Sequence, residues 1–122
     1  MSTSEVKTPG PDHAITIEPH DGRVMVSAGD RLVADSEQAL ELSEGGYPVV
    51  LYIPLSDVDG TILKRSDRTS HCPYKGDASY FDVCTDDGVL EDVAWCYETP
   101  HDAVSEIRGL VAFYPDRVRI ES

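Results

Sequence analysis

The segment Thr69–Gly76 carries several kinds of reactive side chain within a short stretch. Its sequence, TSHCPYKG, places a hydroxyl, an imidazole, a thiol, a phenol and an amine close together. Lys75 is one of only three lysines, the others being Lys7 and Lys64. A partly desolvated lysine can act as a base or nucleophile, or stay charged and hold a carboxylate or phosphate. Lys75 is therefore the first functional candidate; a loop lysine paired with one of the many aspartates is the alternative.

Cys72 lies next to His71 and three residues before Lys75. Neighbouring positive charge favours the nucleophilic thiolate form, so Cys72 is a second catalytic candidate. The alternative is a buried and inert thiol. The other cysteines, Cys84 and Cys96, complete no C-x-x-C pair, so the spacing argues against a disulfide framework and a four-cysteine zinc site.

The sequence offers no metal or cofactor motif. The four histidines show no metal-ligand spacing: His13, His20, His71 and His101. Gly45-Gly46 is a turn and does not begin a glycine-rich phosphate loop. We therefore expect no metal and no cofactor.

Two segments after Lys75 predict a β-hairpin. Asp77–Cys84 and Val89–Tyr97 have the residue types and alternation of strands. If the turn between them spans Thr85–Gly88, the two strands pair in one fixed register along their whole length.

This register places Ala78 opposite Trp95, and Tyr80 opposite Val93. Because side chains alternate across a strand, Tyr80, Trp95 and Tyr97 fall on one face with Ala78 between them. A small residue beside three large rings leaves a recess, and Tyr and Trp each keep a polar tip to aim at a ligand. The alternative is a plain aromatic core patch.

The rest of the chain predicts a mainly β fold. Strands are expected at Ala14–Glu18, Arg23–Ala28, Arg31–Asp35, Tyr47–Ile53, Leu110–Tyr114 and Val118–Glu121, the last two forming a hairpin. Gln38–Leu42 fits either a helical turn or a strand, and Ser66–Gly76 is expected to be a polar loop. Thr99 as N-cap and Pro100 as first helical residue predict one short helix that Gly109 ends. We expect about eight or nine short, largely antiparallel strands.

The length of the chain corresponds to one ordinary domain. Residues 1–13 are expected to form a flexible tail, and residues 14–122 a single β domain. No apolar stretch approaches the roughly 20 residues that cross a bilayer, and the N-terminus lacks the apolar core of a secretory signal. An odd number of cysteines fits a reducing compartment. These features predict a soluble, cytoplasmic protein.

The chain is strongly acidic. Its 23 acidic residues against 10 basic ones give a formal net charge of −13, which repels phosphate backbones and anionic lipid. We therefore expect neither nucleic acid nor membranes as partners. Adaptation to high cytosolic salt is one hypothesis, because salt screens self-repulsion; an ordinary acidic protein is the other. Under the first, the unfolding midpoint should rise from low to molar KCl, and a constant midpoint would reject it.

The sequence Asp57-Val58-Asp59-Gly60-Thr61 matches the DxDGT motif of haloacid-dehalogenase-type phosphatases. Lys75 and Asp86-Asp87 could serve as its downstream groups. That chemistry needs a nucleophilic aspartate at the end of a parallel strand and crossover helices after it. Pro54 breaks the preceding strand, and mostly strands follow Thr61. A phosphatase using Asp57 and Asp59 is therefore a disfavoured alternative.

Two strings, TSHCPYKGDASY at residues 69–80 and AWCYETP at residues 94–100, carry a specific resemblance. With Val33–Ser36, Tyr52–Val58 and Ile107–Tyr114, they resemble the domain-of-unknown-function 427 family from about Ile15 to Ile120. The resemblance implies a compact β-tent-like fold, as in methionine sulfoxide reductase B. Many tent relatives hold zinc on two C-x-x-C pairs, which this sequence lacks. The family is also catalogued as a nucleotidyltransferase, but the sequence has no phosphate cradle to support that activity.

The resemblance implies that a polar-aromatic pocket is lined by Thr69, Cys72, Lys75, Tyr80, Trp95 and Tyr97, with Tyr52 as a weaker candidate. The favoured hypothesis is a domain that binds a small anionic or aromatic molecule, stacked on the rings and held by Lys75. The alternative is an enzyme in which Lys75 or Cys72 acts as base or nucleophile and Tyr80 donates a proton. A structural or protein-interaction role is a third.

Overall fold

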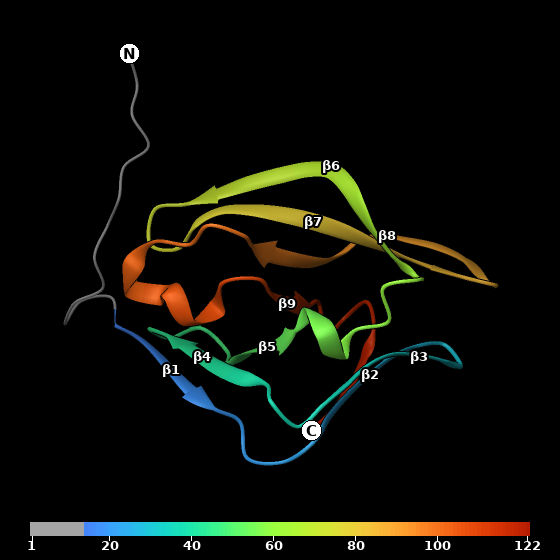
Figure 1. Ribbon diagram of the computed structural model, residues 1–122, viewed down its shortest axis with the longest axis horizontal. Coiled ribbons are helices and arrows are strands. Elements are labelled where there is room, and N and C mark those ends of the chain that lie inside the picture. The colour runs from blue at the N-terminus through green and yellow to red at the C-terminus, as the bar shows by residue number, and fades with distance from the viewer. Residues whose placement is uncertain (1–13) are drawn as a thin grey trace.

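The computed structural model describes residues 14–122 as two antiparallel β-sheets (Figure 1). The larger sheet contains, in spatial order, β1 (Ile15–Pro19), β4 (Leu40–Glu44), β5 (Val50–Pro54), β9 (Leu110–Phe113), β8 (Gly88–Tyr97), β7 (Gly76–Thr85) and β6 (Leu63–Cys72). The smaller sheet contains β10 (Arg119–Glu121), β2 (Val24–Ala28) and β3 (Arg31–Ser36). The mainly β prediction is confirmed, with ten strands in the described part of the chain. The predicted tail, residues 1–13, lies outside the described residues.

The larger sheet has a core on both faces. In Figure 1 it curves, so that β6 and β7 lie above β4 and β1. One face packs against the smaller sheet, where Ile53 of β5 and Val24 of β2 belong to one buried cluster. Tyr52, the neighbour of Ile53, belongs to a second cluster with Tyr97 and Ile107. Because neighbouring side chains in a strand point to opposite faces, β5 contributes to both clusters.

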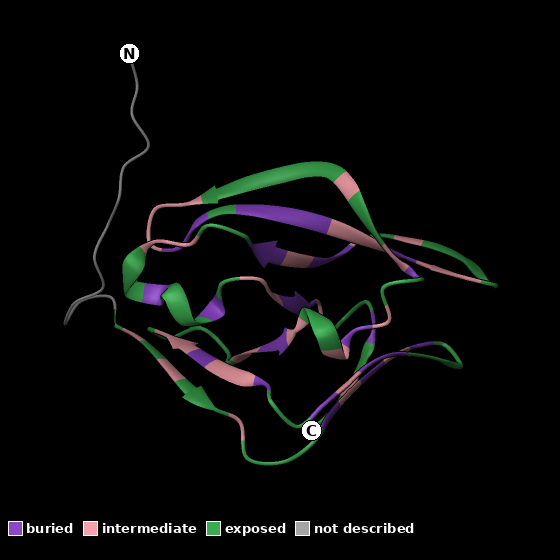
Figure 2. Ribbon diagram, in the orientation of Figure 1, coloured by how far each residue is buried: buried purple, intermediate pink, exposed green. Residues whose placement is uncertain are grey.

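The segment predicted as a polar loop is mostly strand. Residues 63–72 form β6, an edge strand that pairs with β7, and Figure 2 shows it exposed over most of its length while β7 is largely buried. An edge strand with little buried surface carries no hydrophobic alternation, so its sequence resembles a loop. The pairing is also interrupted between Arg65 and Thr69 by a bulge-like register shift.

The predicted hairpin register holds only near its turn. Cys84 pairs with Val89 as predicted, but beyond an irregularity at Phe81–Val83 the pairing shifts by two residues. Tyr80 therefore lies opposite Trp95, and Ala78 lies opposite Tyr97. A shift of one residue would have reversed the faces, whereas a shift of two preserves them. Tyr80, Trp95 and Tyr97 therefore still share one face of the hairpin, although the predicted cross-strand partners of Ala78 and Tyr80 were wrong.

Two predictions for the C-terminal third were wrong. The expected helix is a 3-10 helix, η2 (Asp102–Ile107), which starts after His101 without a side-chain cap. The expected final hairpin does not form, because β9 lies between β5 and β8 while β10 pairs with β2 of the smaller sheet. The other short helix, η1 (Leu55–Asp57), follows β5, and the ambiguous segment before Leu42 is part of β4.

Candidate functional site

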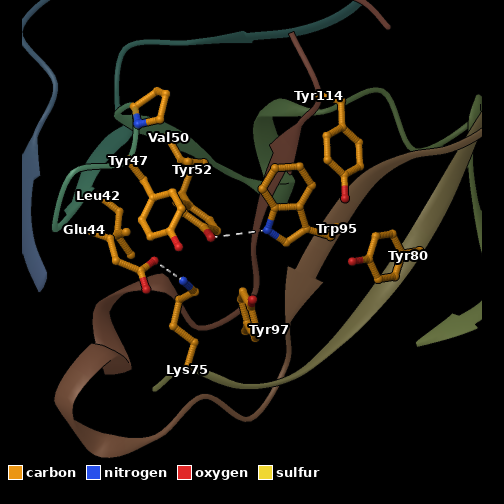
Figure 3. A pocket seen from close by; sticks show the side chains of 11 residues that line it. Leu42, Glu44, Tyr47, Val50, Tyr52, Lys75, Tyr80, Trp95, Tyr97 and Tyr114 are labelled. Carbon is orange, nitrogen blue, oxygen red and sulfur yellow. Dashed lines mark hydrogen bonds and ion pairs between the residues drawn. The ribbon is translucent and has the colours of Figure 1, made fainter. Parts of the chain in front are cut away.

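A cavity of about 220 Å³ opens on the face of the larger sheet that carries the second cluster (Figure 3). We call it the inner cavity. Five of the six tyrosines and the single tryptophan of the chain line it: Tyr47, Tyr52, Tyr80, Trp95, Tyr97 and Tyr114. The other lining residues are Leu42, Glu44, Pro48, Val50 and Lys75. The large polar aromatics of this chain are thus concentrated in one place.

Strand pairing brings the rings together. Trp95 of β8 lies opposite Tyr80 of β7 on one side and opposite Ala112 of β9 on the other. Tyr52 of β5 reaches the same face from two strands away. The small side chain of Ala112 between Trp95 and Tyr52 leaves space for the rings to meet above it.

Trp95 is held by contacts on two sides. Its indole Nε1–H donates a hydrogen bond to the hydroxyl of Tyr52 at 3.2 Å, and the two rings meet edge to face with centroids 6.4 Å apart. On its other side the centroid of Tyr114 lies 4.5 Å away, with the planes tilted by 45°. The edge-to-face contact with Tyr52 is one of the favoured arrangements of aromatic pairs. These contacts fix the position of the Trp95 ring, which lines the inner cavity.

Burial favours the neutral form of three inner-cavity phenols, those of Tyr52, Tyr97 and Tyr114. Burial raises the pKa of Tyr114 from 10.0 to about 12, and burial also raises the pKa of Tyr52 and of Tyr97. A neutral phenol can both donate and accept a hydrogen bond. These three phenols therefore offer the cavity hydrogen-bonding groups without tyrosinate charge near neutral pH.

These raised pKa values predict alkaline destabilisation. Between pH 10 and 12 an unfolded chain releases phenolic protons that the folded protein retains, so the free energy of unfolding should fall as pH rises above 10. Tyr97→Phe removes one such proton and should make the decline shallower, by up to about 1.4 kcal/mol per pH unit. Denaturant unfolding across this pH range measures it. An unchanged slope in Tyr97→Phe would contradict the predicted role of Tyr97.

Lys75 is buried and paired. Its ammonium contacts Glu44 Oε1, and the side chains of Lys75 and Glu44 are 11% and 14% exposed. The backbone fixes the turn that presents it: Lys75 N–H donates to the Cys72 carbonyl at 3.2 Å, and the Lys75 carbonyl accepts from His101 N–H at 2.9 Å. Lys75 is thus not an unpaired point charge; it is paired with a carboxylate, but the partner is a glutamate instead of the aspartate considered as the alternative, and the pair is largely buried.

The backbone conformation of Gly76, which follows Lys75, predicts that a side chain at this position destabilises the protein. Its φ is +115°, and an added Cβ would lie 3.3 Å from the Thr99 carbonyl oxygen. Gly22 has a φ of +111° but open space around it, so it is a matched control. Gly76→Ala should therefore destabilise the protein by about 1–3 kcal/mol more than Gly22→Ala, measured by denaturant unfolding. Equal losses would show that the contact with Thr99 is unimportant.

The structure brings five of the seven sequence-proposed residues to the inner cavity: Tyr52, Lys75, Tyr80, Trp95 and Tyr97. Thr69 pairs with Ser79, which alternates with Ala78 and Tyr80, so it lines an open cavity elsewhere on the β6–β7 surface. Cys72 packs against the second cluster but is not among the lining residues.

The sequence reasoning missed Glu44, Tyr47 and Tyr114. They lie at the end of β4, in the turn that follows it and just after β9, far along the chain from the TSHCPYKG segment. No local motif marks them. The one available indication was the number of tyrosines in a chain with few other aromatics.

The aspartates of the DxDGT motif make structural contacts. Asp57 Oδ2 accepts a hydrogen bond from Ser36 Oγ at 2.6 Å. Asp59 accepts hydrogen bonds from Thr61 and Arg31, which lower its pKa to about 2. The preceding strand, β5, pairs antiparallel with both neighbours, so the motif lacks the parallel strand that a phosphatase of this type requires.

Two features of the described residues bear on the class of site. No cluster of three or more histidine, cysteine, aspartate or glutamate side chains there is placed to bind a metal ion. Within residues 14–122, no helix has the length and apolarity needed to span a membrane.

The fold and the inner cavity define an antiparallel β protein with one tyrosine-rich site. The family model for a domain of unknown function, DUF427, matches residues 16–122. Since this covers most of the chain, the protein belongs to the DUF427 family, as the sequence resemblance predicted. A comparison with curated proteins found no match.

Proposed function

We propose that this protein binds a small, flat organic molecule with a single ring in the inner cavity. The observation that carries the proposal is the gathering of five tyrosines and the only tryptophan around one cavity. Aromatic side chains offer large flat contact areas, and their polar tips can orient a bound molecule.

The size of the inner cavity sets the size of the ligand. Its volume is about 220 Å³, whereas an engineered apolar cavity of about 150 Å³ accepts benzene. The inner cavity is therefore suited to one six-membered ring with one or two small substituents. Typical pockets for drug-sized molecules are larger, roughly 300–1,000 Å³.

The Lys75–Glu44 pair determines the charge that the inner cavity accepts. A purely anionic molecule held by Lys75 would have to break the largely buried ion pair between Lys75 and Glu44, which costs several kcal/mol. A neutral ring with hydroxyl or similar groups avoids this cost and can bond to the neutral phenols. We therefore favour an uncharged polar ring over a simple anion.

The same contacts argue against catalysis. Lys75 would act as a base or nucleophile only when released from Glu44, and Cys72 is not among the residues that line the inner cavity. The arrangement is better suited to holding a molecule than to attacking one.

Trp95 gives a direct test, because the only tryptophan of the chain lies in the wall of the cavity. Titration with phenol and p-cresol should change Trp95 fluorescence and raise the melting temperature, benzoate should do so less, and cyclohexanol, which is not flat, should have no effect. Tyr97→Ala should weaken the response, and the exposed Lys64→Met should not. No response to any ring compound at millimolar concentration would overturn the proposal.

A further inference from the structure

A second cavity of about 440 Å³ adjoins the inner cavity at Tyr114, which lines both. We call it the outer cavity. Its other lining residues are Arg68, Glu91, Asp92, Asp116 and Arg117. Figure 3 places Tyr114 and Tyr80 at the opposite end of the inner cavity from Lys75 and Glu44. The charged residues of the inner cavity thus lie far from Tyr114, and the outer cavity supplies charged groups at the Tyr114 end.

Arg68 connects the two cavities. Its guanidinium carbon lies 4.5 Å from the centroid of the Tyr80 ring, a favourable cation–π position. The backbone at Arg68 is anchored, since its N–H donates to Ser66 Oγ at 3.1 Å. One face of an inner-cavity ring is thus covered by a positive charge that belongs to the outer cavity.

The arginines of the outer cavity differ from most others in the described residues. Arg23, Arg31, Arg65 and Arg119 each form an ion pair with a carboxylate. Within residues 14–122, neither Arg68 nor Arg117 forms one. Carboxylates are abundant in a chain of net charge −13, so two guanidinium groups in one cavity that form no ion pair with the described residues are available to a carboxylate from elsewhere.

The outer cavity also carries negative charge. Glu91 and Asp116 are exposed, whereas the Asp92 carboxylate accepts a hydrogen bond from Ser66 Oγ at 2.6 Å. Burial is the main cause of the raised pKa of Tyr114, but Arg68 lowers it and Asp116 raises it. Charges of both signs therefore act on the residue that joins the two cavities.

We infer that the outer cavity binds the carboxylate and ammonium groups of a zwitterion whose ring enters the inner cavity, as in a single-ring aromatic α-amino acid. A ligand with only a carboxylate would face Glu91 and Asp116, and one with only an ammonium would face Arg68 and Arg117. A ligand carrying both charges can place its carboxylate near the two arginines and its ammonium near the two acidic residues. This inference rests on the proposed function, because the ring must enter the inner cavity.

Four ligands that share one ring test the inference. p-Cresol has the ring alone, tyramine adds the ammonium, hydroxyphenylpropionate adds the carboxylate, and L-tyrosine has both. Binding is measured by calorimetry at low salt. We expect L-tyrosine to bind at least about tenfold more tightly than p-cresol, with the singly charged ligands between them.

Variants separate the two charged contacts. Arg68→Gln should weaken binding of L-tyrosine and hydroxyphenylpropionate by about five- to tenfold, leave p-cresol unchanged and not weaken tyramine, whose ammonium is repelled by Arg68. Asp116→Asn should weaken L-tyrosine and tyramine instead. Arg108→Gln is the matched control, since Arg108 is exposed and outside both cavities.

The outcomes distinguish the two proposals. Equal affinity for all four ligands, or an Arg68→Gln effect no larger than that of Arg108→Gln, would overturn the inference while the ring site stands. Absence of binding by p-cresol and by the other three would overturn the proposed function itself.

Discussion

Tyr52→Ala should destabilise the protein by about 3–5 kcal/mol, the typical cost of removing a buried aromatic side chain. Tyr52 is only 1% exposed and is the largest of the fully buried side chains. Its removal would leave a cavity in the second cluster and remove the hydrogen-bond acceptor of the Trp95 indole N–H. Chemical denaturation monitored by circular dichroism measures the loss without relying on Trp95.

Two variants show whether burial is the cause. Tyr52→Phe keeps the ring and removes only the hydroxyl, so it should cost about 1 kcal/mol. Tyr47→Ala removes a tyrosine that lines the same cavity but is 69% exposed, and it should change stability by about 0.5 kcal/mol or less. If Tyr47→Ala cost as much as Tyr52→Ala, the assignment of Tyr52 as a buried anchor would be wrong.

Lys75→Met should lower the free energy of unfolding by about 3 kcal/mol, because it removes the ammonium from a largely buried ion pair with Glu44. For a chain of this length that corresponds to a fall in melting temperature of roughly 10 °C. The exposed Lys64→Met is the matched control and should change stability by about 0.5 kcal/mol or less.

A double variant identifies the pair as the origin of the loss. Lys75→Met combined with Glu44→Leu removes both charges, so it should be less destabilised than Lys75→Met alone. Additive losses, or a Lys75→Met variant as stable as Lys64→Met, would show that Glu44 and Lys75 do not stabilise each other.

The aromatic face could be predicted because strand alternation has a period of two. Tyr80, Trp95 and Tyr97 share a face in any register that differs by an even number of residues, and the irregularity near Asp82 shifts the pairing by two. The register itself could not be predicted. Asp92, on the opposing strand, has a φ of +52°, which no motif of its neighbours indicates.

Contacts between segments far apart in the chain could not be predicted from the sequence. The partner of Lys75 lies 31 residues earlier, and many aspartates and glutamates could have filled that role. Tyr114 joins the inner cavity only because β9 is inserted between β5 and β8, instead of pairing with the C-terminal strand. The order of strands in the sheet, which decides these neighbours, depends on tertiary packing and leaves no local pattern.

Edge position explains the misassigned β6. A strand with one paired side and largely exposed side chains needs no apolar alternation, so its SDRTSH sequence at residues 66–71 is also typical of a loop. Without such alternation the sequence does not indicate which face of β6 Thr69 occupies, and in the structure Thr69 lies on the opposite face from Tyr80.

The most direct measurement of the central claim uses the single indole N–H resonance of Trp95 in a proton–nitrogen correlation spectrum. This proton donates to Tyr52 inside the inner cavity, so a bound ring should move its signal, whereas the backbone signal of Gly22, in open space, should stay in place. We predict a saturable shift of the Trp95 indole signal on titration with p-cresol and no shift with cyclohexanol. An indole signal that stays unchanged up to millimolar p-cresol would contradict a ring-binding site at this position.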